Sequence, residues 1–238
     1  MKLKSGFTLA EVLVALAIVG ILAAVTLPAI QASLKKSAVG PSLMKAIGTL
    51  ENANRLILQE KDTDSLSSLC EDNYLGCIAK KASLSKLYSQ NEGPEFKENF
   101  DGTNPKKYSY KGPVYVSDDG VVFANYQYDA VQTGTQIPSS LVDKYEGNYY
   151  LILVDINGIK GSPNVMGKDI FSLLVDGSGI VIAHGSREYV AYNELDSTKK
   201  TYYWDNDKCK NGQKPTGTNG RLCSGSVIDN GGKVLYKY

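Results

Sequence analysis

The chain begins with a long apolar stretch that contains almost no polar positions. From Phe7 to Ile30 the only charged residue is Glu11. A helix rises about 1.5 Å per residue, so 24 helical residues span roughly 36 Å, enough for a hydrocarbon core of about 30 Å. The pattern predicts a membrane-spanning helix behind a short basic leader, MKLKSG.

Beyond this stretch the apolar positions follow helical spacing. The residues at 4-3-4-3 intervals are Leu43, Ile47, Leu50, Asn54 and Ile57. This spacing places them on one face of a helix that reaches about Gln59, and Gly40-Pro41 is expected to bend it. We expect residues 31–60 to be an amphipathic continuation of the first helix that packs against a globular head.

The remaining sequence predicts a second helical region followed by strands. Residues 62–90 have helical character, with Asp64 or Ser65 as the N-cap. The apolar side of this region is Leu66, Leu69, Ile78, Leu84 and Leu87. Residues 91–112 are rich in Gly, Pro, Asn and Lys, which favours a loop.

Strand signals then dominate, and β-prone apolar runs separated by turn residues predict an antiparallel sheet. Hairpins are expected over residues 114–126, 170–185 and 227–238, and a strand over residues 149–156. The last hairpin would turn at Asn230-Gly231. The fold class is therefore α+β: a long N-terminal helix packed on a head that contains an antiparallel β-sheet.

Composition excludes some classes of function. The chain has 26 Lys+Arg, 25 Asp+Glu and a net charge of +1, whereas nucleic-acid proteins normally show a basic excess or stripe. The single histidine, His184, argues against a His-rich metal site or a His-based triad. We expect no nucleic-acid partner and no enzymatic activity.

Glu11 needs an explanation because it interrupts an apolar helix. An ionisable residue at mid-helix costs about 2.5–3.5 kcal/mol on insertion scales, which by default indicates a function and a partner. The alternative is that Glu11 lies near the end of the span and its carboxylate reaches the interface. Energy alone leaves both interpretations open.

The residues GFTLAE (6–11), followed by an apolar helix, resemble the class III leader of type IV pilins and type II secretion pseudopilins. The resemblance covers residues 1 to about 36. It implies that a prepilin peptidase cuts between Gly6 and Phe7 and methylates the new amino group of Phe7. It also implies that Glu11 pairs with the N-terminal amine of a neighbouring subunit during assembly, which would give the carboxylate its partner.

The resemblance also bears on helix shape and orientation. Gly20 and Pro28 lie where many pilins place helix-weakening residues, and Pro28 lacks a backbone donor, so a kink or melted stretch is expected. Basic residues flank both ends of the span, so the positive-inside rule does not decide orientation. The resemblance places the leader in the cytoplasm of a bacterium and the head outside.

The implied organisation has four parts: a leader over residues 1–6, a transmembrane and filament-core helix over 7–30, its amphipathic continuation over 31–60, and a periplasmic or extracellular head over 61–238. The implied function is a structural subunit of a type IV pilus-like or type II secretion pseudopilus filament. The alternative is a minor tip pilin whose head binds a glycan, a surface or secreted cargo.

The implied partners follow from the steps of membrane insertion, processing and filament assembly. They are membrane lipid before assembly, the prepilin peptidase, an inner-membrane assembly platform, and then other copies of the chain and sister pilin subunits. The protein is expected first as a single-pass protein of the inner membrane and later in a periplasmic or cell-surface filament.

Two stretches of the head carry a weaker resemblance. The segment DINGIKG (155–161), with Asn164, Gly167, Asp169 and Phe171, resembles a pattern in the heads of pseudopilin-like proteins. The terminal residues 223–236 resemble their last hairpin. Residues 60–145 match no family pattern.

The four cysteines form two sequence-local pairs. In an exported head, an oxidising compartment favours disulfides between Cys70 and Cys77 and between Cys209 and Cys223. The second disulfide would also resemble the C-terminal disulfide loop of pilins. Free thiols and a zinc site are the alternatives, although no CxxC occurs to support zinc.

No cofactor is expected, with calcium as the one candidate. Asp155, Asn157 and Asp169 offer the oxygen ligands that calcium prefers, and some pseudopilin heads bind calcium in a nearby loop. The alternative is that these residues form turns through local hydrogen bonds. EF-hand spacing is absent, because Met166 occupies the position expected to hold Glu.

Overall fold

The computed structural model describes residues 8–71, 73–109, 112–126, 150–186, 209 and 211–237. The chain divides into two compact units, Met1–Ala38 and Val39–Tyr238. Helix α1 (Leu9–Lys61) contributes to both of them. The two units are described separately below.

The described part of the first unit is the N-terminal portion of α1. This portion is long and apolar enough to cross a membrane, and none of the side chains in its most apolar window is buried. The helix continues through Pro28 and through Gly40-Pro41 without interruption, so neither proline breaks it. A proline removes one hydrogen bond of the ladder, and its neighbours can still continue the helix. The weakening expected at Gly20 and Pro28 stays a prediction.

In the second unit, α1 packs one face against the head. Its buried residues are Val39, Gly40, Leu43, Ala46, Leu50, Ala53, Asn54 and Ile57. This set contains four of the five positions predicted from helical spacing, and the fifth, Ile47, is half-buried against the same core.

The predicted helical region over residues 62–90 is wrong in its second half. The structure has two short helices, α2 (Leu66–Cys70) and α3 (Tyr74–Ile78), followed by strand β1 (Leu84–Tyr88). Positive φ at Glu71 (46°) ends α2, whereas α3 ends at Ile78 and a turn that includes Ser83 (φ 53°) leads into β1. Ser65 is the N-cap of α2, and its hydroxyl accepts a hydrogen bond from the Ser68 amide.

The head contains a six-stranded antiparallel sheet. Its further strands are β4 (Val114–Ser117), β5 (Val122–Asn125), β6 (Tyr150–Asp155), β7 (Ile170–Val175) and β8 (Val181–Ala183). The strand order is β1-β4-β5-β6-β7-β8. The hairpins predicted over residues 114–126 and 170–185 and the strand predicted over 149–156 are confirmed.

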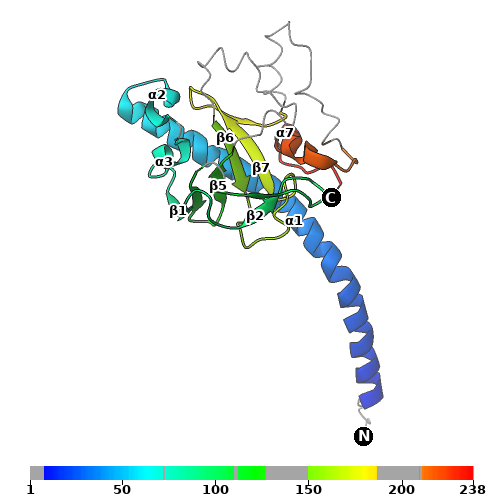
Figure 1. Ribbon diagram of the computed structural model, residues 1–238. Coiled ribbons are helices and arrows are strands. Elements are labelled where there is room, and N and C mark those ends of the chain that lie inside the picture. The colour runs from blue at the N-terminus through cyan, green and yellow to red at the C-terminus, as the bar shows by residue number, and fades with distance from the viewer. Residues whose placement is uncertain are drawn as a thin grey trace. The chain divides into compact units, whose positions relative to one another are not determined.

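Both faces of the sheet are covered. Along β6, Ile152 and Val154 pack into the core that includes α1, whereas Leu151 and Leu153 point to a second core on the opposite face. The second core is covered by the short strands β2 (Glu95–Lys97) and β3 (Pro105–Lys107), which pair with each other. The segment predicted as a loop over residues 91–112 therefore forms a small layer of its own. Figure 1 shows α1 on one side of β5–β7.

The predicted hairpin over residues 227–238 is wrong. The chain instead forms a 3-10 helix, η2 (Gly217–Leu222), and helix α7 (Cys223–Asp229). The glycines that suggested a hairpin turn close this helix: the Gly231 and Gly232 amides donate to the carbonyls of Ile228 and Val227 at 3.0 and 2.9 Å. Gly231, which follows the cap residue Asn230, has the positive φ that a helix C-terminal cap of this kind requires, and Gly232 has positive φ as well.

Candidate functional site

The N-terminal candidate site lies partly outside the described residues. Gly6 and Phe7, the expected cleavage and methylation residues, are in that undescribed part, so processing there stays a prediction. The description begins at Thr8, immediately before α1.

Thr8 and Glu11 form a reciprocal cap at the start of α1. The Thr8 amide and hydroxyl donate to Glu11 Oε2 at 2.7 and 2.8 Å, and the Glu11 amide donates to Thr8 Oγ1 at 3.3 Å. This is the capping-box arrangement, in which Thr or Ser and a Glu three residues later satisfy free amides at a helix start. The carboxylate also lies at the positive end of the helix dipole. Sequence reasoning did not find this cap, although the Thr-x-x-Glu spacing is its signal.

The cap gives Glu11 partners within its own chain. The carboxylate is exposed, so it is open to a second donor from outside the chain. Pairing with the amine of a neighbouring subunit is an interaction between chains and stays a prediction.

Apart from Glu11, the helix from Leu9 to Leu34 presents apolar side chains in every direction. The exposed set of large apolar residues is Leu9, Val12, Leu13, Val14, Leu16, Ile18, Val19, Ile21, Leu22, Val25, Leu27, Ile30 and Leu34. A helix that is apolar all round needs an apolar environment on all sides, unlike an amphipathic helix on a protein surface. Lipid or a bundle of similar helices meets this requirement.

The structure brings the three calcium candidates together in one loop between β6 and β7. Asp155 is fully buried and accepts hydrogen bonds from the Tyr108 hydroxyl at 2.7 Å and the Asn157 amide at 3.2 Å. Asp169 accepts from the amides of Asn164 and Val165, both at 2.7 Å, and from the Asn157 side chain at 3.1 Å. The four carboxylate oxygens therefore have protein donors that hold the loop in shape.

Burial changes the acidity of both carboxyls. It raises the pKa of Asp155 to about 6, an effect that the hydrogen bond from Tyr108 opposes and the nearby Asp169 charge reinforces. Burial likewise raises the pKa of Asp169, against the lowering effect of its three hydrogen bonds. Desolvation outweighs hydrogen bonding at both sites.

These oxygens fit the turn-forming alternative more directly than a cation site. A calcium ion would compete with the N–H and O–H donors for the same oxygens. Among the described residues, no group of three or more His, Cys, Asp or Glu side chains is placed to hold a metal ion. Calcium binding at Asp155, Asn157 and Asp169 stays a prediction that calorimetry on a soluble head lacking residues 1–35 would test.

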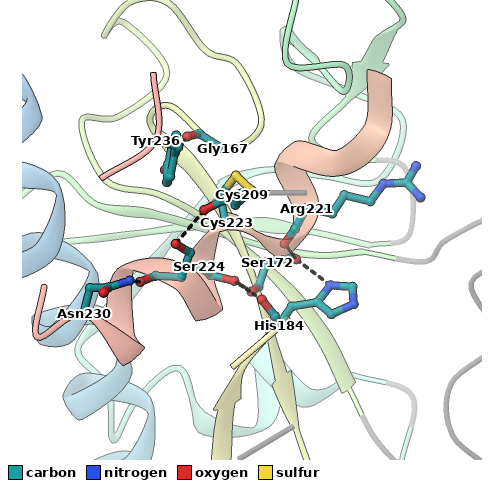
Figure 2. The surroundings of a disulfide bond; sticks show 10 residues. Gly167, Ser172, His184, Cys209, Arg221, Cys223, Ser224, Asn230 and Tyr236 are labelled. Carbon is teal, nitrogen blue, oxygen red and sulfur yellow. Dashed lines mark hydrogen bonds between the residues drawn. A yellow bond between two sulfur atoms is a disulfide. The ribbon is translucent and has the colours of Figure 1, made fainter. Parts of the chain in front are cut away.

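His184 lies in a buried polar cluster rather than at an open surface (Figure 2). The Ser172 hydroxyl donates to the Arg221 carbonyl at 3.0 Å and lies 3.0 Å from His184 Nδ1. Because the hydroxyl has one proton and gives it to Arg221, the Nδ1–H of His184 donates to Ser172. Burial, together with the charge of Arg221, lowers the pKa of His184 to about 3. The pair therefore lacks the arrangement of a base that activates a hydroxyl.

A buried ion pair adjoins this cluster and was not predicted from the sequence. Arg221 donates to Glu98 Oε1, which also accepts from the Tyr126 hydroxyl, and the Asn104 side chain donates to Oε2 at 2.5 Å. Arg221 and Glu98 are 3% and 4% exposed. The pair joins the C-terminal region to the β2–β3 layer, and its members are too far apart in the chain for any spacing rule to connect them.

The four cysteines form the two sequence-local disulfides. Cys70 bonds to Cys77, joining α2 and α3, and Cys209 bonds to Cys223 at the start of α7. Figure 2 shows the second disulfide and, directly after Cys223 in the chain, Ser224 with its hydroxyl. This hydroxyl hydrogen-bonds to the carbonyls of Ser172 and His184 at 2.7 and 3.0 Å.

Comparison with protein families identifies the N-terminus. Residues 1–27 match the family described as the prokaryotic N-terminal methylation motif, which is the signature of type IV pilins and pseudopilins. Neither the comparison with curated proteins nor that with solved structures gave a match. The resemblance expected from residues 6–11 is confirmed, and the chain has a pilin-type N-terminus followed by an α+β head.

Proposed function

We propose that this chain is a structural subunit of a type IV pilus-like or type II secretion pseudopilus filament. The observation that carries the proposal is the methylation motif over residues 1–27, joined to a helix whose apolar side chains are exposed on all sides. The motif points to a structural subunit rather than an enzyme. The head, from residue 39 onward, is the part that would select partners.

The proposed mechanism is mechanical. The precursor is held in the membrane by α1, with the head outside the cytoplasm, until the prepilin peptidase removes residues 1–6. The assembly platform then transfers the helix from lipid to a bundle of the same helices. Both environments cover the apolar surface between Leu9 and Leu34, so the transfer exposes little of it to water. Pairing of Glu11 with the amine of a neighbour sets the register of the bundle.

The processing step is tested on the mature protein. Mass spectrometry of protein from the native membrane or filament should find an N-terminal peptide that begins with methylated Phe7. A protein that keeps Met1, or that is cut after Ala32 like a secretory precursor, would contradict the proposal.

The register step is tested by Glu11→Gln. Glutamine preserves the capping box with Thr8 because Gln also serves at that position, but it removes the charge. The variant should enter the membrane and be processed normally, whereas its filament yield should fall about ten-fold or more, as expected for loss of a buried charge pair. Glu71→Gln, an exposed substitution in the head, is the matched control and should assemble normally. Normal filaments of Glu11→Gln would remove the pairing from the mechanism.

The alternative of a minor tip subunit shares the same N-terminus and differs in abundance. Quantitative mass spectrometry of purified filaments separates the two, because a major subunit is present throughout the filament and a tip subunit in a few copies. No contact among the described residues of the head favours a glycan or cargo ligand.

A further inference from the structure

The strongest feature that the proposed function does not use is a group of lysines at the C-terminal end of the head. Lys214, Lys233 and Lys237 are all exposed, and none forms an ion pair within the described part of the chain. Asp101 lies close enough to interact electrostatically with Lys214, and one oxygen of its carboxylate also accepts two hydrogen bonds from Thr103.

Backbone contacts hold these lysines together. The Lys237 amide donates to the Gln213 carbonyl at 2.8 Å, and the Gly212 amide donates to the Leu235 carbonyl at 2.9 Å. Lys214 directly follows Gln213, so its backbone lies beside that of Lys237. Lys233 lies on the same C-terminal segment, which is fixed by the buried side chains of Val234 and Tyr236.

The C-terminal segment also touches α1 where the head begins. The backbones of Gly40 and Gly232 are so close that a Cβ on Gly40 would lie 1.8 Å from the Gly232 carbonyl oxygen. Lys233 follows this contact by one residue. The group of lysines is therefore tied to Gly40, the second residue of the head unit.

Chain length places Gly40 near the end of the apolar segment. Gly40 lies six positions after Leu34, the last large apolar residue of that segment. Six residues span about 9 Å as a helix, and about 22 Å when fully extended. Whatever the arrangement of the two units, Gly40 thus stays within about 22 Å of Leu34, after which Lys35 and Lys36 begin the polar part of the helix. The polar headgroup region, some 5–8 Å thick on each side of the bilayer, lies within this range.

We propose that Lys214, Lys233 and Lys237 bind the headgroups of anionic phospholipids on the membrane face beneath the head, before the subunit assembles. This inference rests on the proposed membrane-inserted precursor. Each lysine held near an anionic surface strengthens binding of the head to the membrane about five-fold. This attraction falls off within a Debye length of about 8 Å at physiological salt. Three lysines on one fixed segment therefore hold the head against an anionic membrane and release it as the helix is withdrawn.

The test uses the full-length chain in nanodiscs, either of phosphatidylcholine alone or with about a third of phosphatidylglycerol. Hydrogen exchange of the amides over residues 231–237 should slow about five-fold or more in the anionic nanodiscs. The slowing should disappear at about 0.5 M salt, because screening then acts over only a few ångströms.

The variant Lys214→Gln/Lys233→Gln/Lys237→Gln should lose this slowing. Lys61→Gln/Lys80→Gln/Lys86→Gln is the matched control, because it removes three exposed charges elsewhere on the head and should keep the slowing. All substitutions replace exposed side chains, and retained disulfides and circular dichroism verify the fold.

Three results would overturn the inference. The first is an equal rate of hydrogen exchange in both kinds of nanodisc, and the second is an equal loss of the slowing in both triple variants. The third is slowing that occurs only when subunits contact one another, which would assign the lysines to a neighbouring subunit. A chain that washes out of the bilayer altogether would instead contradict the proposed precursor, so the two failures are distinguishable.

Discussion

Asp155 and His184 are buried ionisable residues whose effects on stability have opposite dependence on pH. Asp155 has a folded pKa of about 6 against about 3.9 in an unfolded chain. Its contribution to stability is fully present below about pH 4 and is lost as pH rises through about 6. His184 has a folded pKa of about 3 against about 6.5 unfolded. Its contribution is present above about pH 6.5 and is lost as pH falls through about 3.

Asp155→Asn should separate the two effects. Asparagine keeps the shape of the side chain and an acceptor for Tyr108, but it does not titrate. Between pH 4 and pH 7, wild type should therefore lose roughly 2 kcal/mol of unfolding free energy relative to the variant, most of the roughly 3 kcal/mol that a shift of two pKa units represents at about 1.4 kcal/mol each. Urea unfolding of a head lacking residues 1–35, followed by circular dichroism, measures it. A difference that is constant with pH would contradict the burial effect.

Single residues were predicted best where their role is local. The cysteine pairs follow from sequence proximity, and Asp155, Asn157 and Asp169 do meet in one loop. The partners that come from distant parts of the chain were missed. Tyr108 lies 47 residues from Asp155, and Glu98 lies 123 residues from Arg221. Only the folded sheet brings such residues together.

Among the elements, α1 offers a matched pair of glycines that tests the contact with the C-terminal segment. Gly40→Ala would place a methyl group on the Gly232 backbone, so the head should lose about 1–3 kcal/mol of stability. Gly48 has no atom within 4 Å of its ideal Cβ. Gly48→Ala should therefore stabilise the helix by up to about 1 kcal/mol, through propensity alone.

The measurement is urea unfolding of the same fragment for both variants. Equal effects of the two substitutions would show that α1 does not depend on the C-terminal segment. Stabilisation by Gly40→Ala would mean that Gly232 moves aside at little cost.

Elements with strongly β-prone apolar runs were predicted correctly, and those set by tertiary packing were not. The hairpin over residues 114–126 follows from its own pattern, as do β6 and β7. In contrast, Asn230-Gly231 suits both a hairpin turn and a helix cap, because each needs positive φ. The Cys209–Cys223 disulfide and the bonds of Ser224 hold residues 223–229 in a helix, and these are long-range contacts.

For the whole molecule, the N-terminal helix was predictable because its composition suits only an apolar environment. The division of the head into two cores on opposite faces of one sheet was not, because the β2–β3 layer comes from a stretch rich in turn-forming residues. The Cys209–Cys223 bond closes a loop with a sequence separation of 14, which stabilises the head by roughly 3 kcal/mol in the chain-entropy model.

The contact between Gly40 and Gly232 has a consequence for biosynthesis. A ribosome makes Gly40 early and Gly232 near the end of the described chain, and almost 200 residues lie between them. The segment that covers this part of α1 is thus among the last to be translated. This contact can form only when translation is nearly complete, so the Gly40 side of the helix stays uncovered by the C-terminal segment until then.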